Sequence, residues 1–322
     1  MDPQIASFKV TGLCAANFQS FNPDGTVDLL AISSHISELH KQGVSSVFVC
    51  GTTGESLKMS VTERKSVLSG WIAAAKESAA AGNPLLNIIA HVGAESVIDA
   101  QELAAHAASA GAVAIGVVPP TFFKPIDVNA CCSLLEAIAS HAPKLPVYFY
   151  HIAIMTGVSI RCDHLLKRIS ELQNEGRLTQ FRGIKYSDAD LHIFANCVAF
   201  ENGKFDILYG KDEQGLGALA MGAKGFVGST YNYNGRAANK MIQAYKTNDL
   251  QTALAEQRKI QLLVNLLYSS SEFGPPGCNV GKAIMEILLG GKGCGAPRLP
   301  GAAVSDVVKL KSRLEEIGYF SW

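Results

Sequence analysis

The sequence has no excess of either charge, because 28 Lys and Arg residues are matched by 28 Asp and Glu residues. Proteins that bind nucleic acid or anionic membranes usually carry a basic patch or a basic excess. The sequence also lacks any apolar run approaching the ~18 residues that a membrane-spanning helix needs. We therefore expect neither a nucleic-acid nor a membrane partner, and we expect a function that involves small molecules.

The first residues, Met1–Val10, lack the basic start and long apolar run of a signal peptide. The chain holds eight cysteines, an even number that permits disulfides, but none of them is spaced as CxxC. Several of the cysteines lie in segments with apolar periodicity. These features predict buried, reduced thiols and a cytoplasmic location.

No Pro-, Ser- or Gly-rich linker divides the 322 residues, and short apolar runs alternate with longer amphipathic stretches. The runs with strand character are Phe8–Ala16, Val44–Cys50, Leu86–His91, Ala112–Val118, Pro146–Tyr150, Phe181–Lys185, Phe205–Tyr209 and Gly225–Gly228. The helical stretches between them are Val27–Gln42, Ser60–Ala81, Ser96–Ala110, Asp127–His141, Arg161–Gln173, Asp188–Phe200 and Asp212–Met221. This alternation predicts parallel βαβ units.

Eight such units favour a closed α/β structure, the (β/α)₈ or TIM barrel, over an open doubly wound sheet. Asp24 before the first helix and Gly43 after it have the chemistry of a helix start and stop. Four further helices are predicted at Lys240–Thr247, Leu250–Tyr268, Val280–Leu289 and Ala303–Ile317. We expect a barrel over residues 1–247 and a C-terminal helical extension over residues 248–322.

Polar residues follow five of the predicted strands, and in such barrels the active site lies at the carboxyl ends of the strands. Among them, Lys185 follows the apolar Ile184. Burial favours the neutral amine of a lysine, which can attack a carbonyl carbon. The alternative is a lysine at a strand end with its amine in solvent, but the other strand ends favour the nucleophile.

Three other strand ends carry candidate groups. The turn with Thr52 and Thr53 can hold a carboxylate or phosphate, although an ordinary βα turn has the same composition. Tyr150 can relay a proton or be a core aromatic. Asp212 and Glu213 can bind hydroxyl groups or stabilise the start of the following helix. The histidines lack metal-ligand spacing, so no metal is expected.

From about Phe8 to Pro300 the chain resembles the dihydrodipicolinate synthase/N-acetylneuraminate lyase family, and within it the animal cytosolic type of the lyase branch. The motifs that carry the resemblance are Gly51–Glu55, Ile89–Gly93, Tyr148–Ile152, Gly183–Lys185, Gly210–Glu213 and Gly228–Asn232. The resemblance implies an aldolase that cleaves N-acetylneuraminate to N-acetylmannosamine and pyruvate. It also implies a homotetramer that needs no cofactor.

The resemblance further implies a role for each matched residue. Lys185 would form an imine with pyruvate, Thr52 and Thr53 would bind the pyruvate carboxylate, and Tyr150 would move the proton. The residues expected to hold the polyhydroxy tail of the sugar acid are Ser187, Gly210, Asp212, Glu213 and Ser229.

The sequence also departs from the family pattern. Met155 stands where the synthases keep an Arg that binds a substrate carboxylate, which argues against an aspartate-semialdehyde substrate. Ala153 replaces a frequent Pro, and Phe122 and Phe123 stand where many relatives have a Tyr that reaches a neighbouring subunit. Two rivals stay open: another pyruvate-dependent aldolase, such as one for 4-hydroxy-2-oxoglutarate, and a non-catalytic relative that binds sugar acids.

Overall fold

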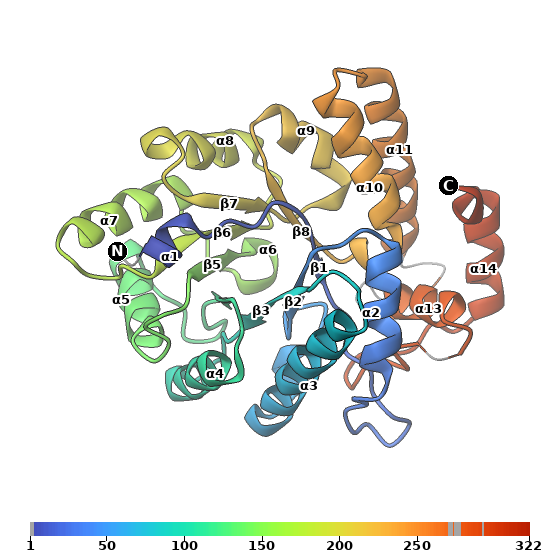
Figure 1. Ribbon diagram of the computed structural model, residues 1–322, viewed down its shortest axis with the longest axis horizontal. Coiled ribbons are helices and arrows are strands. Elements are labelled where there is room, and N and C mark those ends of the chain that lie inside the picture. Colours follow the sequence, from blue (N-terminus) through green and yellow to red (C-terminus); the bar gives the residue numbers. More distant parts are fainter. Residues whose placement is uncertain (1–2, 270–272, 274–277, 292) are drawn as a thin grey trace. The chain divides into compact units, whose positions relative to one another are not determined.

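A computed structural model describes residues 3–269, 273, 278–291 and 293–322 (Figure 1). Its eight parallel strands follow one another around a closed barrel in the order of the chain. They are β1 (Gly12–Ala16), β2 (Ser46–Val49), β3 (Asn87–His91), β4 (Ala114–Val117), β5 (Val147–His151), β6 (Phe181–Tyr186), β7 (Asp206–Tyr209) and β8 (Gly225–Gly228). The predicted (β/α)₈ fold and all eight predicted strands are thereby confirmed.

Helices separate the strands along the chain. Up to β8 they are α1 (Pro3–Ser7), α2 (Ala31–Lys41), η1 (Ser56–Lys58), α3 (Val61–Ala80), α4 (Val97–Ala110), α5 (Val128–Ala139), α6 (Ala153–Thr156), α7 (Cys162–Asn174), α8 (Leu191–Ala199), η2 (Phe200–Asn202), η3 (Asp212–Gln214) and α9 (Gly215–Ala220). After β8 they are α10 (Tyr231–Lys246), α11 (Leu250–Leu267), α13 (Asn279–Leu288), α14 (Val307–Glu316) and η4 (Tyr319–Ser321). Within the described part of the chain, no helix is both long and apolar enough to cross a membrane.

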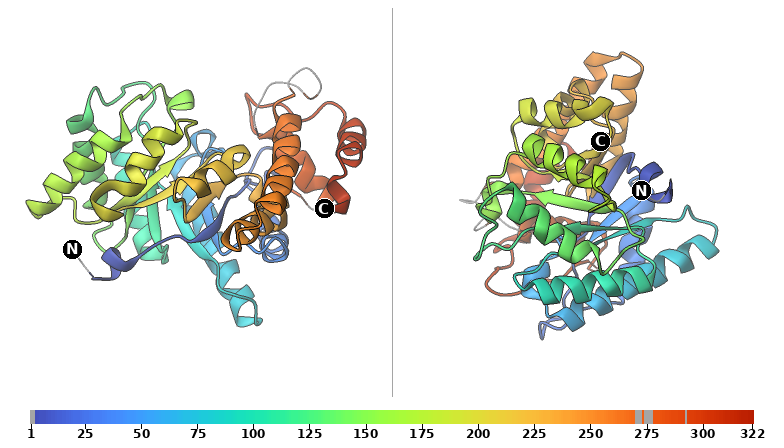
Figure 2. Two further views of the ribbon diagram at one scale, coloured as in Figure 1. Left: turned by 90° about the horizontal axis from the view of Figure 1, so that it is seen from above. Right: turned by 90° about the vertical axis from the view of Figure 1, so that its left-hand side faces the viewer.

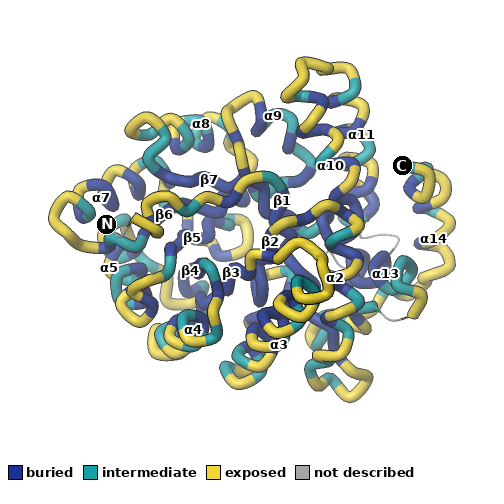
Figure 3. The backbone as a smooth tube through the Cα atoms, in the orientation of Figure 1, coloured by how far each residue is buried: buried dark blue, intermediate teal, exposed yellow. Residues whose placement is uncertain are grey.

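The chain divides into two compact units, of which the first comprises Met1–Thr11, Asn87–Lys211 and Gly217–Val227. In this unit α4, α5, α7 and α8 lie outside strands β3 to β7 (Figures 1 and 2). Every residue of β4 to β7 is buried, whereas the outer faces of these helices are exposed (Figure 3). Most of their residues are therefore apolar, as expected for a parallel sheet that is covered on both faces.

A polar network fixes the amino ends of β6 and β7. The Asp206 carboxylate accepts hydrogen bonds from the Val10 amide at 2.9 Å and from the Tyr148 hydroxyl at 2.7 Å. Arg182 donates to the carbonyl oxygens of Phe8 and Lys204. These buried charges lie at the end of the strands away from Lys185, where polar residues usually contribute to stability rather than to catalysis.

The second unit comprises Gly12–Leu86, Asp212–Leu216 and Gly228–Trp322. In it α10 and α11 lie side by side (Figure 1). The C-terminal helices surround a core of their own, which includes Phe18, Tyr233, Leu263, Ile284, Leu310 and Leu314. The Tyr319 hydroxyl donates to the Tyr233 carbonyl oxygen at 2.7 Å, which ties the end of the chain to this core. The predicted domain boundary at residue 247 stays a prediction.

Three predicted helix starts are wrong by four residues or more, and one of them is that of the last long helix, which begins at Val307 rather than Ala303. The first helix begins at Ala31 rather than Val27, because Asp24 accepts hydrogen bonds from the amide and hydroxyl of Thr26 within a turn and does not cap a helix. Gly43, with φ 66°, confirms the predicted end of that helix. The helix predicted from Lys240 begins at Tyr231, directly after β8.

The cysteine prediction is confirmed as far as the structure reaches. All eight cysteines are free, and all but Cys278 are buried. Burial raises the pKa of several of these thiols, to about 11 for Cys50 and to about 12 for Cys197, which keeps them protonated and unreactive.

Candidate active site

Lys185 and Tyr150 lie against each other at the carboxyl ends of β6 and β5. The parallel register pairs the two residues directly, and both are buried, with exposed fractions of 4% and 3%. The Lys185 Nζ lies 3.7 Å from the centroid of the Tyr150 ring. The structure thus brings a buried lysine beside a strand-end tyrosine, the pair that an imine-forming amine and a proton carrier require.

Two strand-end histidines near this pair were not singled out by the sequence analysis. His91 ends β3 and meets the Tyr150 ring edge-on at a centroid distance of 6.0 Å. His151 ends β5, and its Nε2 lies 3.5 Å from a carboxylate oxygen of Asp188. Burial lowers the pKa of His151, opposed by Asp188, so the imidazole is mostly neutral near pH 7. Both histidines could have been found in the sequence, because each is a polar residue that ends an apolar strand.

Ser187 and Gly210 meet just beyond the ends of β6 and β7. The backbone amide of Ser187 donates to the His151 carbonyl oxygen, and that of Gly210 donates to the Tyr186 carbonyl oxygen, both at 2.8 Å. A Cβ atom at Gly210 would lie 2.1 Å from the Ser187 Oγ. Glycine is therefore required at position 210 to leave room for the Ser187 hydroxyl, and the structure brings these two predicted residues together.

In the second unit, Thr52 and Thr53 occupy the turn that follows β2. Thr52 is exposed and Thr53 is partly buried. The Glu55 amide donates to the Thr52 carbonyl oxygen at 3.0 Å, and Glu55 has a left-handed φ of 55°. The 3₁₀ helix η1 separates this turn from α3, so the turn is not itself the amino end of that helix.

Asp212 is held by the turn after β8. Its Oδ2 accepts hydrogen bonds from the Thr230 amide at 2.9 Å and from the Thr230 hydroxyl at 2.6 Å. A Cβ atom at Gly228 would lie 1.8 Å from the Asp212 Oδ1, so glycine is required there. Burial raises the pKa of Asp212 to about 6, against the effect of the Thr230 hydrogen bonds. Thr230, which was not among the predicted site residues, thus fixes one of them. Glu213 follows Asp212 in the chain, Ser229 precedes Thr230, and both are partly buried.

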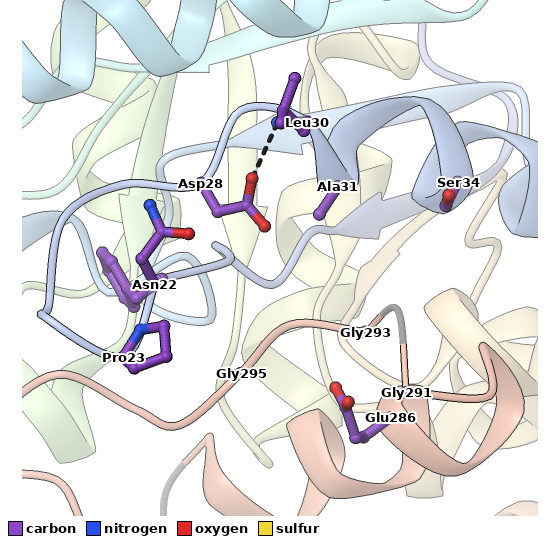
Figure 4. A pocket seen from close by; sticks show the side chains of 11 residues that line it. Asn22, Pro23, Asp28, Leu30, Ala31, Ser34, Glu286, Gly291, Gly293 and Gly295 are labelled. Carbon is purple, nitrogen blue, oxygen red and sulfur yellow. Dashed lines mark hydrogen bonds between the residues drawn. The ribbon is translucent and has the colours of Figure 1, made fainter.

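A hollow of about 380 Å³ lies in the second unit, between the segment before α2 and the glycine-rich segment after α13 (Figure 4). Asp28 and Glu286 are among the residues that line it, and Asp28 accepts a hydrogen bond from the Leu30 amide. None of the predicted site residues lines this hollow. Within the described residues, no group of three His, Cys, Asp or Glu side chains is arranged to hold a metal ion.

Comparison with known proteins identifies the family of the chain. The model of the dihydrodipicolinate synthetase family matches residues 9–290. The chain belongs to the dihydrodipicolinate synthetase family. Membership in the family confirms the resemblance that the strand-end motifs carry.

Curated relatives within this family are similar over most of the chain. The chain is 42% identical to the N-acetylneuraminate lyase of Gallus gallus, over 96% of both chains. It is 41% identical to that of Homo sapiens, over 91% of this chain and 87% of the other. Among solved structures, the N-acetylneuraminate lyase (sialic acid aldolase) of Aliivibrio salmonicida matches with a TM-score of 0.86 and 33% identity, over 97% of this chain and 98% of that one.

Proposed function

We propose that this protein is a class I aldolase that cleaves N-acetylneuraminate to N-acetylmannosamine and pyruvate, with Lys185 as its nucleophile. The observation that carries the chemistry is the buried Lys185 amine, 3.7 Å from the centroid of the Tyr150 ring at the carboxyl ends of two neighbouring strands. The choice of substrate is supported by relatives named N-acetylneuraminate lyase that are 39–42% identical over most of the chain.

The reaction begins when the Lys185 amine adds to the C2 ketone of the open-chain sugar acid. Loss of water leaves a protonated imine, which accepts the electron pair of the bond between C3 and C4. Tyr150, as the phenolate or through the substrate carboxylate, removes the proton of the C4 hydroxyl as that bond breaks, and N-acetylmannosamine leaves as the aldehyde. The remaining enamine takes a proton at C3, and water hydrolyses the imine to release pyruvate and the free amine.

The two ends of the substrate need different partners. Thr52 and Thr53 offer hydroxyls and turn amides to the carboxylate, which fits anion binding by turns. The polyhydroxy tail needs hydrogen-bonding groups in defined positions. The groups that we assign to it follow β6, β7 and β8, namely Ser187, Gly210, Asp212, Glu213 and Ser229.

Met155 bears on the choice of substrate because its side chain carries no charge. A second carboxylate, as in aspartate semialdehyde, would need a cation, and leaving it unpaired in a partly desolvated site costs roughly 2–5 kcal/mol. We therefore expect efficient cleavage of N-acetylneuraminate and little condensation of pyruvate with aspartate semialdehyde.

The substrate choice is tested by assaying both reactions side by side at matched concentrations. Comparable kcat/KM for the two reactions would contradict the substrate assignment and leave the imine chemistry intact. Met155→Arg should move the preference toward aldehydes that carry a carboxylate, and no change would show that residue 155 does not face the site. Ile98→Arg is the control, since it places the same charge at an exposed apolar position of α4, away from α6.

The assembly and the location are further parts of the proposal. Phe122, Phe123, Ile126 and Ile154 are large apolar side chains that are more than four-fifths exposed in the single chain. Contiguous exposed apolar surface of this kind favours association with other chains. We propose a homotetramer in which these residues are covered. The free cysteines favour a reducing compartment, which supports a cytoplasmic location.

A further inference from the structure

The turn between β2 and η1, residues Gly51–Glu55, has an unfavourable backbone conformation. Cys50, just before the turn, and Glu55, its last residue, have φ values of 59° and 55°, in the left-handed region that residues other than glycine rarely adopt. A Cβ atom at Gly54 would lie 3.2 Å from the Cys50 Cα, so the turn is also tightly packed. Such a conformation persists only where surrounding contacts hold it.

The Glu55 side chain supplies those contacts. Its carboxylate is buried, with only 2% of the side chain exposed. The Oε1 lies 2.6 Å from the Nζ of Lys282. The Oε2 accepts hydrogen bonds from the Lys58 Nζ at 2.9 Å and from the Arg298 amide at 3.0 Å. Both carboxylate oxygens are thus directed toward positive or donor groups.

Lys282 reaches Glu55 from the C-terminal helix α13. Only 1% of its side chain is exposed, and its Nζ also donates to the Ala296 carbonyl oxygen at 3.2 Å. The same amine lies 4.4 Å from the centroid of the Phe21 ring. A second residue of this segment, Cys278, contacts the turn directly through its sulfur, 3.7 Å from the Thr52 carbonyl oxygen.

A fully buried ion pair is weak evidence for a stabilising role, because apolar residues of similar volume often stabilise a fold as well. It is more informative about geometry, since loss of Lys282 leaves the buried Glu55 carboxylate with Lys58 as its remaining ion-pair partner and removes the cation from its Oε1, which forces its surroundings to shift. At this place the surroundings are the turn that carries Thr52 and Thr53.

We infer that Lys282 is a positioning residue that holds, through Glu55, the Gly51–Glu55 turn in the conformation that binds the carboxylate of the substrate. This inference rests on the proposed function, in which Thr52 and Thr53 bind that carboxylate. Lys282 touches no substrate atom and leaves the reactivity of the Lys185 amine unchanged.

The test compares two ketones that form the same imine, pyruvate with a carboxylate and acetone without one. Wild type and Lys282→Met are incubated with increasing concentrations of each ketone and reduced with borohydride, and the adduct on Lys185 is quantified by mass spectrometry. In Lys282→Met we expect the half-saturating concentration of pyruvate to rise by at least about tenfold, the lower end of what a hydrogen bond to a charged group contributes. The value for acetone should stay unchanged.

Two further variants separate positioning from general loss of structure. Leu310→Ala removes a fully buried side chain from the C-terminal core without contact to the turn, so it should lower the Tm and leave both half-saturating concentrations unchanged. The double variant Glu55→Gln with Lys282→Met leaves no unpaired charge, and the amide oxygen of Gln still accepts from Lys58 and from the Arg298 amide. It should recover part of the pyruvate affinity lost in Lys282→Met.

The outcomes are distinct. If wild type forms no adduct with pyruvate on Lys185, the proposed function fails, and this inference fails with it. If wild type forms the adduct and Lys282→Met has the same half-saturating concentration of pyruvate, only the inference fails. Equal weakening for acetone and pyruvate, or failure of both Lys282→Met and the double variant to fold, assigns Lys282 a purely structural role and also overturns it.

Discussion

The two residues proposed to carry the chemistry are each positioned by a strand. Lys185 and Tyr150 are paired in the parallel register of β5 and β6, so their contact is fixed by backbone hydrogen bonding rather than by flexible loops. The proposed chemistry divides between them, with the amine forming the imine and the phenol moving the proton. That division makes the two roles separable by substitution.

Tyr150→Phe should lose turnover and keep the imine. Proton transfer by a positioned side chain contributes roughly 10²–10⁴-fold in rate, so kcat should fall by that factor. The borohydride-trapped adduct with pyruvate should still form, because the Lys185 amine is untouched. Tyr148→Phe is the control, since its hydroxyl bonds to Asp206 at the other end of the strands. Turnover close to that of wild type in Tyr150→Phe would show that the proton travels by another route.

Asp212 gives a prediction about stability and pH. Burial raises its pKa to about 6, from an ordinary value of 3.8, so the folded state favours the protonated carboxyl. This stabilisation of the folded state is fully present at a pH below the pKa of Asp212 in the unfolded chain. It is lost as the pH rises through the pKa of Asp212 in the folded protein. It corresponds to roughly 3 kcal/mol at 1.36 kcal/mol per pH unit.

Between about pH 4 and about pH 8, the stability of wild type relative to Asp212→Asn should therefore fall by up to about 3 kcal/mol, measured by denaturant unfolding. Asp24→Asn should show the opposite sign. There the hydrogen bonds from Thr26 lower the pKa of an exposed carboxyl, so its stabilisation is lost as the pH falls. A difference between wild type and Asp212→Asn that does not vary with pH would contradict the burial argument.

At the scale of elements, the sequence predicts the strands better than the helix starts. Strands β4 to β7 are buried on both faces, so they appear as short, largely apolar runs, and their charged residues Arg182, Lys185 and Asp206 lie at or next to strand ends. By contrast, α10 begins with Tyr231 and Asn232, and a polar start of this kind is typical of a loop. Asn232 is fully buried and donates to the carbonyl oxygens of Ala16 and Ser229, partners that no local pattern reveals.

The same distinction explains what the sequence reveals of the candidate site. Lys185 was found because a charged residue at the end of an apolar strand is rare. Lys282 was missed, although it too lies in an apolar stretch, on the buried face of α13 with Ile284 and Met285. Its partner Glu55 is more than two hundred residues away in the chain, so only the fold brings the two together.

At the scale of the whole molecule, the apolar residues Phe122, Phe123, Ile126 and Ile154 are costly to expose in an isolated chain. The segments that carry them are adjacent, because the Lys124 Nζ lies 3.0 Å from where a Cβ would stand at Gly157. Association with other chains would cover them without any rearrangement of the strands.

Phe123→Lys should therefore shift the protein from a tetramer to smaller species in sedimentation velocity at equal concentration. A charge in an apolar interface has no partner and opposes association. Ile98→Lys, at another exposed apolar position in α4, is the control and should leave the sedimentation unchanged. A wild-type protein that sediments as a monomer would contradict the proposed assembly.

The central claim, that Lys185 is the nucleophile of a Schiff-base aldolase, is tested most directly by trapping the imine. The protein is incubated with pyruvate, reduced with borohydride and digested, and the modified peptide is mapped by mass spectrometry, with Lys185→Arg as the control. The account predicts one adduct, on Lys185, in wild type and none in the variant. Absence of an adduct in wild type, or an adduct on any other lysine, would contradict it.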